Sequence, residues 1–299
     1  MREKVNGFVG VMAVAILCMV SGLCMVWGIA PVVLAVYVAA CAVCGRYMIT
    51  CIGCAAGVAA GSMGIAGLLH AYEYMIPGPV YSGVMVTEKY LVLLGLAMCL
   101  MKIVYSRNSS SYVRVIVVMS AAVLMGNIVV YADNMLMAAA YGVVEAAIFM
   151  CASVILKPGI GLLYTYICGD ASDVERDESW NISQGIVSLM ALAAVVLWVV
   201  PGEDIYGVNP AFMLALVLIL YAVYRTGAVY GCGMAAVAGS IVSVKLNDSR
   251  WLMWMLLVTL VMLIGRALTG RRKVSASLFY VLGCVLASVA DGTALWNGS

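Results

Sequence analysis

The chain consists of a succession of long apolar runs with almost no charge inside them, and this feature limits what it can fold into. Of the 299 residues, 66% are hydrophobic and only 10% are charged, whereas a soluble domain carries about 25% charged residues. The runs also lack the regular polar–apolar alternation of a membrane β-barrel strand. We therefore expect an all-α fold, a polytopic bundle of transmembrane helices whose backbone groups are satisfied within each helix.

The apolar runs predict ten or eleven membrane spans, since one helix needs about 20 apolar residues to cross a bilayer. The second run is the weakest candidate because it is short and includes Pro31. We interpret the first run as a retained span, because it is longer than the core of a secretory signal and no small-residue cleavage site follows it. The runs are 8–28, 30–44, 48–69, 89–105, 112–131, 134–156, 183–200, 208–224, 227–244, 251–268 and 274–290.

Lysine and arginine residues gather in alternate connections between these runs. The intervening connections 70–88 and 201–207 carry acidic residues instead, and the connection with Lys245, Asp248 and Arg250 is a mild exception. Because basic residues favour the cytoplasmic side, this pattern predicts a multi-pass protein of the cell membrane with a cytoplasmic N-terminus. With eleven spans the C-terminus would then lie outside. The basic positions are Arg2, Lys4, Arg46, Lys102, Arg107, Arg114, Arg225, Arg266, Arg271, Arg272 and Lys273.

The sequence suggests a division into two membrane halves. Residues 1–156 form a first half of about six spans, and residues 182–299 form a second half of about five. Between them, residues 157–181 are predicted to be an acidic cytoplasmic linker, whose acidic spacing does not match a calcium-binding loop. The halves show no convincing sequence repeat, which counts against an inverted-repeat transporter.

Glycine or alanine recurs at every fourth residue in two of the runs. The first set is Gly53, Gly57 and Gly61, and the second is Gly227, Gly231 and Gly239, with Ala235 between the last two. Small residues at this spacing lie on one helix face and allow another helix to approach closely. We interpret both sets as helix-packing faces, rather than as the lining of a transport path.

Glu145 lies near the middle of the sixth run and is the clearest intramembrane polar candidate, with Asn127 in the fifth run as its expected partner. A charge at this depth costs about 2.5–3.5 kcal/mol on insertion scales, so it should be protonated, paired or directed into a cavity. One hypothesis is a proton or ion relay. The other is a neutral glutamic acid hydrogen-bonded between helices, which we favour because the sequence offers no second carboxylate and no evident buried lysine or arginine.

The sequence predicts no catalytic residue, no metal site and no cofactor. The two CxxC pairs, Cys41 with Cys44 and Cys51 with Cys54, are only six residues apart, whereas zinc ribbons separate such pairs by about 15–20 residues. His70 and Glu73 resemble a surface pair. No phosphate-binding loop, metalloprotease, nucleophile-elbow or dinucleotide motif is present, and the net charge of +2 does not favour a nucleic-acid partner.

Several runs resemble the membrane domain of the stage II sporulation protein E family. They include "NISQGIVSLMALAAVVLWVV", "MLALVLILYAVYRTGAVYGCGMAAVAGSIVSV" and "LLVTLVMLIGRALTGRRKVSASLFYVLGCV". Earlier in the chain, "GIAPVVLAVYVAAC" and "EKYLVLLGLAMCLMKIVY" are similar to its first half. The resemblance implies about ten spans that anchor a manganese-dependent serine phosphatase, which acts on a phosphorylated anti-anti-sigma factor, at the division septum of a sporulating cell.

The phosphatase would lie beyond residue 299, and its metal-binding aspartates have no counterpart here, so no enzymatic activity is carried over. Our first hypothesis is a non-enzymatic membrane domain that serves localisation and self-association. It implies the lipid bilayer, a homo-oligomer and cell-division or sporulation proteins as partners. The alternatives are a small-molecule or ion transporter using Glu145, and a subunit of a larger complex.

Overall fold

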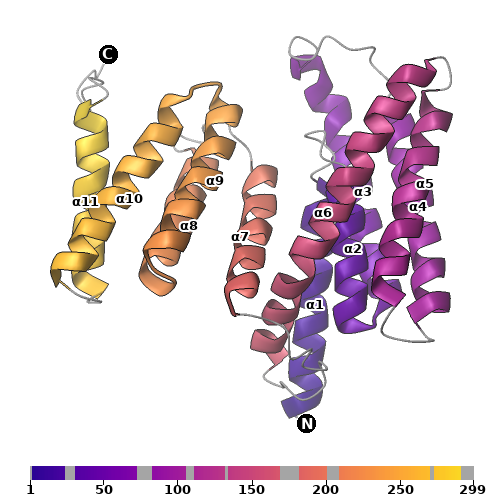
Figure 1. Ribbon diagram of the computed structural model, residues 1–299, viewed down its shortest axis with the longest axis horizontal. Helices are drawn as coiled ribbons and strands as arrows, with labels where there is room; N and C mark the ends of the chain where they lie inside the picture. Colours follow the sequence, from indigo (N-terminus) through magenta and orange to yellow (C-terminus); the bar gives the residue numbers. More distant parts are fainter. Residues whose placement is uncertain are drawn as a thin grey trace. The chain divides into compact units, whose positions relative to one another are not determined.

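The computed structural model describes residues 2–23, 31–72, 83–105, 111–131, 134–168, 182–200, 209–269 and 273–290. These ranges contain eleven helices and no strand, which confirms the predicted all-α class (Figure 1). The helices are α1 (Arg2–Leu23), α2 (Pro31–Cys44), α3 (Tyr47–Tyr72), α4 (Gly83–Tyr105), α5 (Ser111–Val130), α6 (Met135–Cys168), α7 (Ile182–Val199), α8 (Pro210–Arg225), α9 (Ala228–Leu246), α10 (Arg250–Thr269) and α11 (Lys273–Ala290).

Each helix coincides with one apolar run, and the largest difference is at the end of α6. This helix continues to Cys168, so the predicted linker 157–181 begins as helix, and residues 169–181 lie outside the described residues. Pro158 lies inside α6, where a proline can be accommodated because neighbouring helices satisfy the backbone groups it frees. The Gly159 N–H, one residue later, donates to the Ser188 hydroxyl of α7.

Four of the described helices are long and apolar enough to cross a bilayer. They are Tyr112–Val130, Met135–Ile167, Ala228–Leu246 and Arg250–Leu268. This finding is consistent with a membrane protein. The larger count of ten or eleven spans and the cytoplasmic N-terminus remain predictions.

The chain divides into two compact units, Met1–Leu192 and Ala193–Ser299. The division falls within α7, later in the chain than the segment 157–181 at which the sequence suggested a boundary.

The first unit is built around α2. Every residue from Pro31 to Cys41 is buried, because α2 contacts α1, α3, α4 and α6. At about 1.5 Å per residue a 14-residue helix is about 21 Å long, shorter than the roughly 30 Å hydrocarbon layer. This short run is therefore a core helix of the unit, with protein rather than lipid around it.

The second unit contains a series of antiparallel neighbours, in which α8 contacts α9, α9 contacts α10 and α10 contacts α11. The turn between α9 and α10 depends on Asn247, which adopts the left-handed conformation with φ 50°. The next residue, Asp248, accepts the backbone N–H of Arg250 at 3.0 Å and the Arg250 Nε at 2.9 Å. These bonds stabilise the charged form of the carboxyl and lower the pKa of Asp248.

We expect Asp248→Asn to remove a pH-dependent contribution to the stability of this turn. Because the folded pKa lies below the ordinary value of about 3.9, the contribution is fully present above that value. It disappears as the pH falls through the lowered pKa. The unfolding midpoints of the wild type and the variant, measured in detergent across this pH range, should differ near neutrality and converge in acid. Midpoints that stay equally far apart in acid would contradict the assignment.

Candidate functional site

Glu145 of α6 is the centre of a polar cluster in the first unit. Its Oε2 atom accepts three hydrogen bonds, from Lys89 Nζ at 2.8 Å, from Asn127 Nδ2 at 2.7 Å and from the Tyr90 hydroxyl at 3.0 Å. The partners come from two other helices, since Lys89 and Tyr90 belong to α4 and Asn127 belongs to α5. The structure thus places Asn127 beside Glu145, as the sequence suggested, and adds Lys89 and Tyr90.

The Lys89 ammonium is enclosed by this cluster. Besides Glu145, it donates to Asn127 Oδ1 at 3.1 Å and lies 4.7 Å from the centroid of the Tyr90 ring. The Lys89 side chain is 4% exposed and that of Glu145 is 20% exposed. The expectation that Glu145 lacks a buried basic partner was therefore wrong: the two residues form an ion pair between α4 and α6.

Lys89 was missed because it is the first residue of the apolar run 89–105, which suggested a position at the membrane surface. In the structure α4 begins at Gly83, so Lys89 lies almost two turns inside the helix. Room for its stem comes from Gly126 of α5, since a Cβ at that glycine would lie 3.3 Å from Lys89 Cγ. The adjacent pair Gly126–Asn127 is the sequence feature that could have indicated a partner for a buried lysine, because it offers space beside a polar acceptor.

The cluster satisfies its charges internally. An ion pair in a poorly solvated interior costs several kcal/mol per ion in desolvation, which is recovered only with good geometry and further hydrogen bonds. Asn127 supplies such bonds, because its amide oxygen accepts from Lys89 while its amide nitrogen donates to Glu145. Chemically the arrangement ties α4, α5 and α6 together and also provides adjacent groups between which a proton could move.

The glycines of α3 lie against α1. A Cβ at Gly53 would lie 2.7 Å from the Ala15 carbonyl oxygen, and a Cβ at Gly57 would lie 2.9 Å from the Met19 carbonyl carbon. Real Cβ atoms essentially never come so close to a backbone, so only glycine fits here. The contacts advance in the same direction along both helices, which therefore run parallel. Gly61, one turn further on, is buried.

The glycines of α9 do not form a single stripe. Gly231 lies against α8, where its Cβ would be 2.6 Å from Val223 Cγ2, and Gly239 lies against α10, where its Cβ would be 3.0 Å from Leu252 Cα. Gly227 was wrongly assigned to this face, because it precedes α9 as the N-cap with φ 108°. A side chain there is disfavoured by the backbone conformation, and the nearest atoms are those of the Arg266 guanidinium, at 3.6 Å or more.

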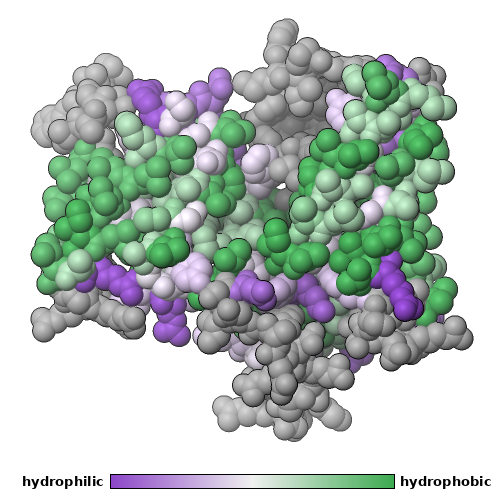
Figure 2. Space-filling model, viewed as in Figure 1, coloured by the Kyte–Doolittle hydropathy of each residue, from purple (hydrophilic) through white to green (hydrophobic). Residues whose placement is uncertain are grey.

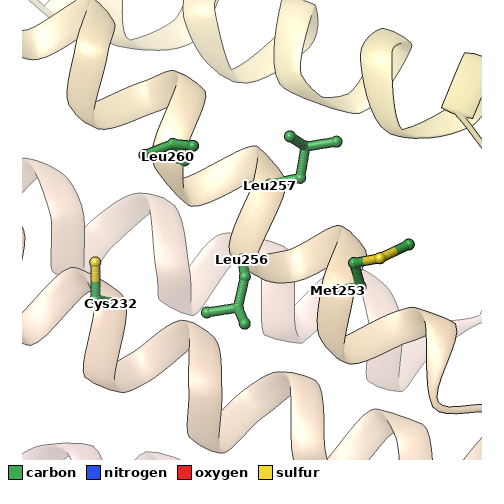
Figure 3. A pocket seen from close by; sticks show the side chains of 5 residues that line it. All are labelled: Cys232, Met253, Leu256, Leu257 and Leu260. Atoms are coloured by element: carbon green, nitrogen blue, oxygen red, sulfur yellow. The ribbon is translucent and has the colours of Figure 1, made fainter.

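A shallow apolar hollow of about 420 Å³ lies between α9 and α10 in the second unit (Figure 3). Cys232 comes from α9, and the other lining side chains come from α10. None of the glycines at 227, 231 and 239 lines it. The hollow has no charged lining residue, so it offers no evident path for a polar solute. Its lining residues are Cys232, Met253, Leu256, Leu257 and Leu260.

Each cysteine pair has one core residue and one partly exposed residue, Cys44 or Cys51. Cys41 and Cys54 are fully buried, and the Cys41 sulfur lies 3.2 Å from the Thr50 hydroxyl. Within the described residues, no group of three or more histidine, cysteine or acidic side chains could hold a metal ion. His70 belongs to α3, but its side chain and Glu73 lie outside what the structure describes.

Comparison with known proteins adds no relative. No known protein family, no curated protein and no solved structure matches the chain. The resemblance to the stage II sporulation protein E family accordingly stays a prediction.

Proposed function

We propose that the chain is a non-enzymatic integral membrane domain that acts as an anchor and self-associating scaffold. The observation that carries this proposal is the distribution of polarity. Large apolar side chains are exposed, with Leu136 at 82% and Val129 at 78%, while Lys89 and Asn127 are buried. This is the reverse of a soluble protein. Figure 2 shows the same pattern as broad apolar faces with hydrophilic residues toward their margins.

The internal contacts support a scaffold more than a moving transporter. The Gly53 and Gly57 contacts leave no space between α1 and α3, and the Glu145 cluster links three further helices. Close packing of this kind favours a rigid body. The glycines at 53, 57, 231 and 239 pack within the chain, so the proposed homo-oligomer rests on the self-association hypothesis from the sequence and not on these contacts.

Membrane integration can be tested by alkaline carbonate extraction of membranes that contain the expressed chain. We expect it to stay in the membrane pellet, whereas a peripheral protein is released. Self-association can then be tested by light scattering in detergent, where we expect a mass above that of one 31.6 kDa chain. Release by carbonate would contradict membrane integration, and a strictly monomeric mass would contradict self-association.

We also propose, from the sequence resemblance alone, that the anchored partner is a sporulation phosphatase or another protein of the division septum. In a sporulating host, a fluorescent fusion should gather at the septum. An even distribution around the cell would contradict this localisation.

The second candidate function is ion or small-molecule transport using Glu145, and the buried Lys89–Glu145 pair favours it. Ionisable residues within membrane helices often belong to proton or ion pathways. If the site conducts, Glu145→Gln should abolish proton or ion flux into proteoliposomes, whereas Glu88→Gln, at an exposed position on α4, should not. The scaffold proposal predicts no flux above empty liposomes for any of the three proteins.

A further inference from the structure

Three basic side chains share one end of the bundle formed by α4, α5 and α6, and we call them the basic rim: Lys102, Arg114 and Lys157. Lys102 lies in the last turn of α4 and Arg114 in the first turn of α5. These two ends lie together, because Lys89 near the start of α4 bonds Asn127 near the end of α5.

Lys157 of α6 joins the same end through an aromatic contact. Its ammonium lies 4.6 Å from the centroid of the Tyr112 ring, in the first turn of α5. The Tyr112 hydroxyl donates to the Ser153 carbonyl at 2.7 Å, which holds the ring against α6. Lys157 is therefore kept at the level where α5 begins.

The depth of the basic rim matches that of lipid headgroups. At about 1.5 Å per residue, Lys102 lies about 29 Å from the start of α4, Arg114 about 24 Å from the end of α5 and Lys157 about 33 Å from the start of α6. The hydrocarbon layer is about 30 Å thick. If the opposite helix ends lie at one membrane surface, all three cations lie near the other.

The charge of the basic rim is not neutralised within the described residues. The ion pairs there are Lys89–Glu145 and Arg250–Asp248, so Lys102, Arg114 and Lys157 take part in none. The carboxylates of α4, α5 and α6 in those residues are Glu88 and Glu145. Glu88 is adjacent to Lys89, about 20 Å along α4 from Lys102, and Glu145 is already paired.

We propose that the basic rim binds the phosphate groups of anionic phospholipids; the inference rests on the membrane placement proposed above. Lipid is favoured as the source of the phosphate because exposed apolar side chains adjoin the cations. Val117 of α5 is 58% exposed and Val154 of α6 is 62% exposed. Each lies about one turn inward of a rim cation, Arg114 or Lys157, so these side chains can contact the acyl chains below a bound headgroup. Each cation near an anionic membrane surface strengthens binding by roughly fivefold.

The test is native mass spectrometry of the purified chain titrated with phosphatidylglycerol or phosphatidylcholine. We expect the wild type to retain phosphatidylglycerol preferentially. Lys102→Gln, Arg114→Gln and Lys157→Gln together should weaken that binding by about a hundredfold. The charge-preserving triple variant Lys102→Arg, Arg114→Lys and Lys157→Arg should bind like the wild type, and so should Arg250→Gln, which removes a cation that already has its own carboxylate.

Equal retention of both lipids, or unchanged phosphatidylglycerol binding by the glutamine variant, would overturn the inference. Displacement of phosphatidylglycerol by millimolar inorganic phosphate would also overturn it, since the ligand would then be a free anion. Circular dichroism checks that the variants remain helical. Carbonate extraction separates the two proposals: a chain that stays in the pellet but does not prefer anionic lipid contradicts only the basic rim, and a chain that is released contradicts membrane placement itself.

Discussion

Lys89→Met should destabilise the first unit by about 3–5 kcal/mol, because it leaves the Glu145 carboxylate buried without its counter-charge. Asn127 also loses the donor to its amide oxygen. The free energy of unfolding can be measured by titration with denaturing detergent, followed by circular dichroism. Lys102→Met is the matched control, since Lys102 belongs to the same helix but is exposed, and its effect should be within about 0.5 kcal/mol.

A double-mutant cycle shows whether the loss comes from the pair. Lys89→Met combined with Glu145→Leu removes both charges and should cost less than the sum of the two single changes, because neither charge is left alone. Additive losses would mean that the two residues do not interact. An unchanged stability for Lys89→Met alone would show that Glu145 is not buried as a charge beside it.

Gly57→Leu should cost about 3 kcal/mol, at the upper end of the usual range for overpacking. Its Cβ would lie 3.0 Å from Gly22 Cα and 2.9 Å from the Met19 carbonyl carbon, so the backbones of α1 and α3 must separate. The same detergent titration measures the loss, and Gly231→Leu tests the corresponding contact between α9 and α8.

Gly95→Leu provides the control for glycine replacement itself. A Cβ at Gly95 meets nothing within 4 Å, and leucine is a better helix former than glycine by somewhat less than 1 kcal/mol. Gly95→Leu should therefore be neutral or slightly stabilising. If Gly57→Leu behaves in the same way, the α1–α3 contact is not as close as the structure indicates.

The helices were predictable because a long apolar run in lipid can satisfy its backbone hydrogen bonds only by forming a helix. Their ends were less predictable: the sequence predicted a linker from residue 157, yet α6 continues to Cys168 because apolar residues follow and Gly159 donates to Ser188 of α7. Lys89 was placed at the surface for a related reason. A hydropathy pattern shows that Lys89 is charged. It does not show that side chains of α5 and α6 bind this charge inside the bundle.

The role of a glycine depends on backbone conformation, which a four-residue spacing does not reveal. Gly231 and Gly227 have the same spacing in the sequence, but one lies within α9 and the other precedes it with a positive φ. Arg266 shows a similar limit. The sequence assigned it to a cytoplasmic connection, whereas it lies in the last turn of α10 and donates to the Val223 carbonyl at the end of α8.

The enclosed position of α2 has a consequence for the order in which this protein assembles. A helix too short to span the bilayer gains little from lipid and depends on its protein neighbours for a dry environment. One of those neighbours, α6, is synthesised only after α3, α4 and α5. During translation the burial of α2 therefore stays incomplete until α6 has been synthesised and packs against it.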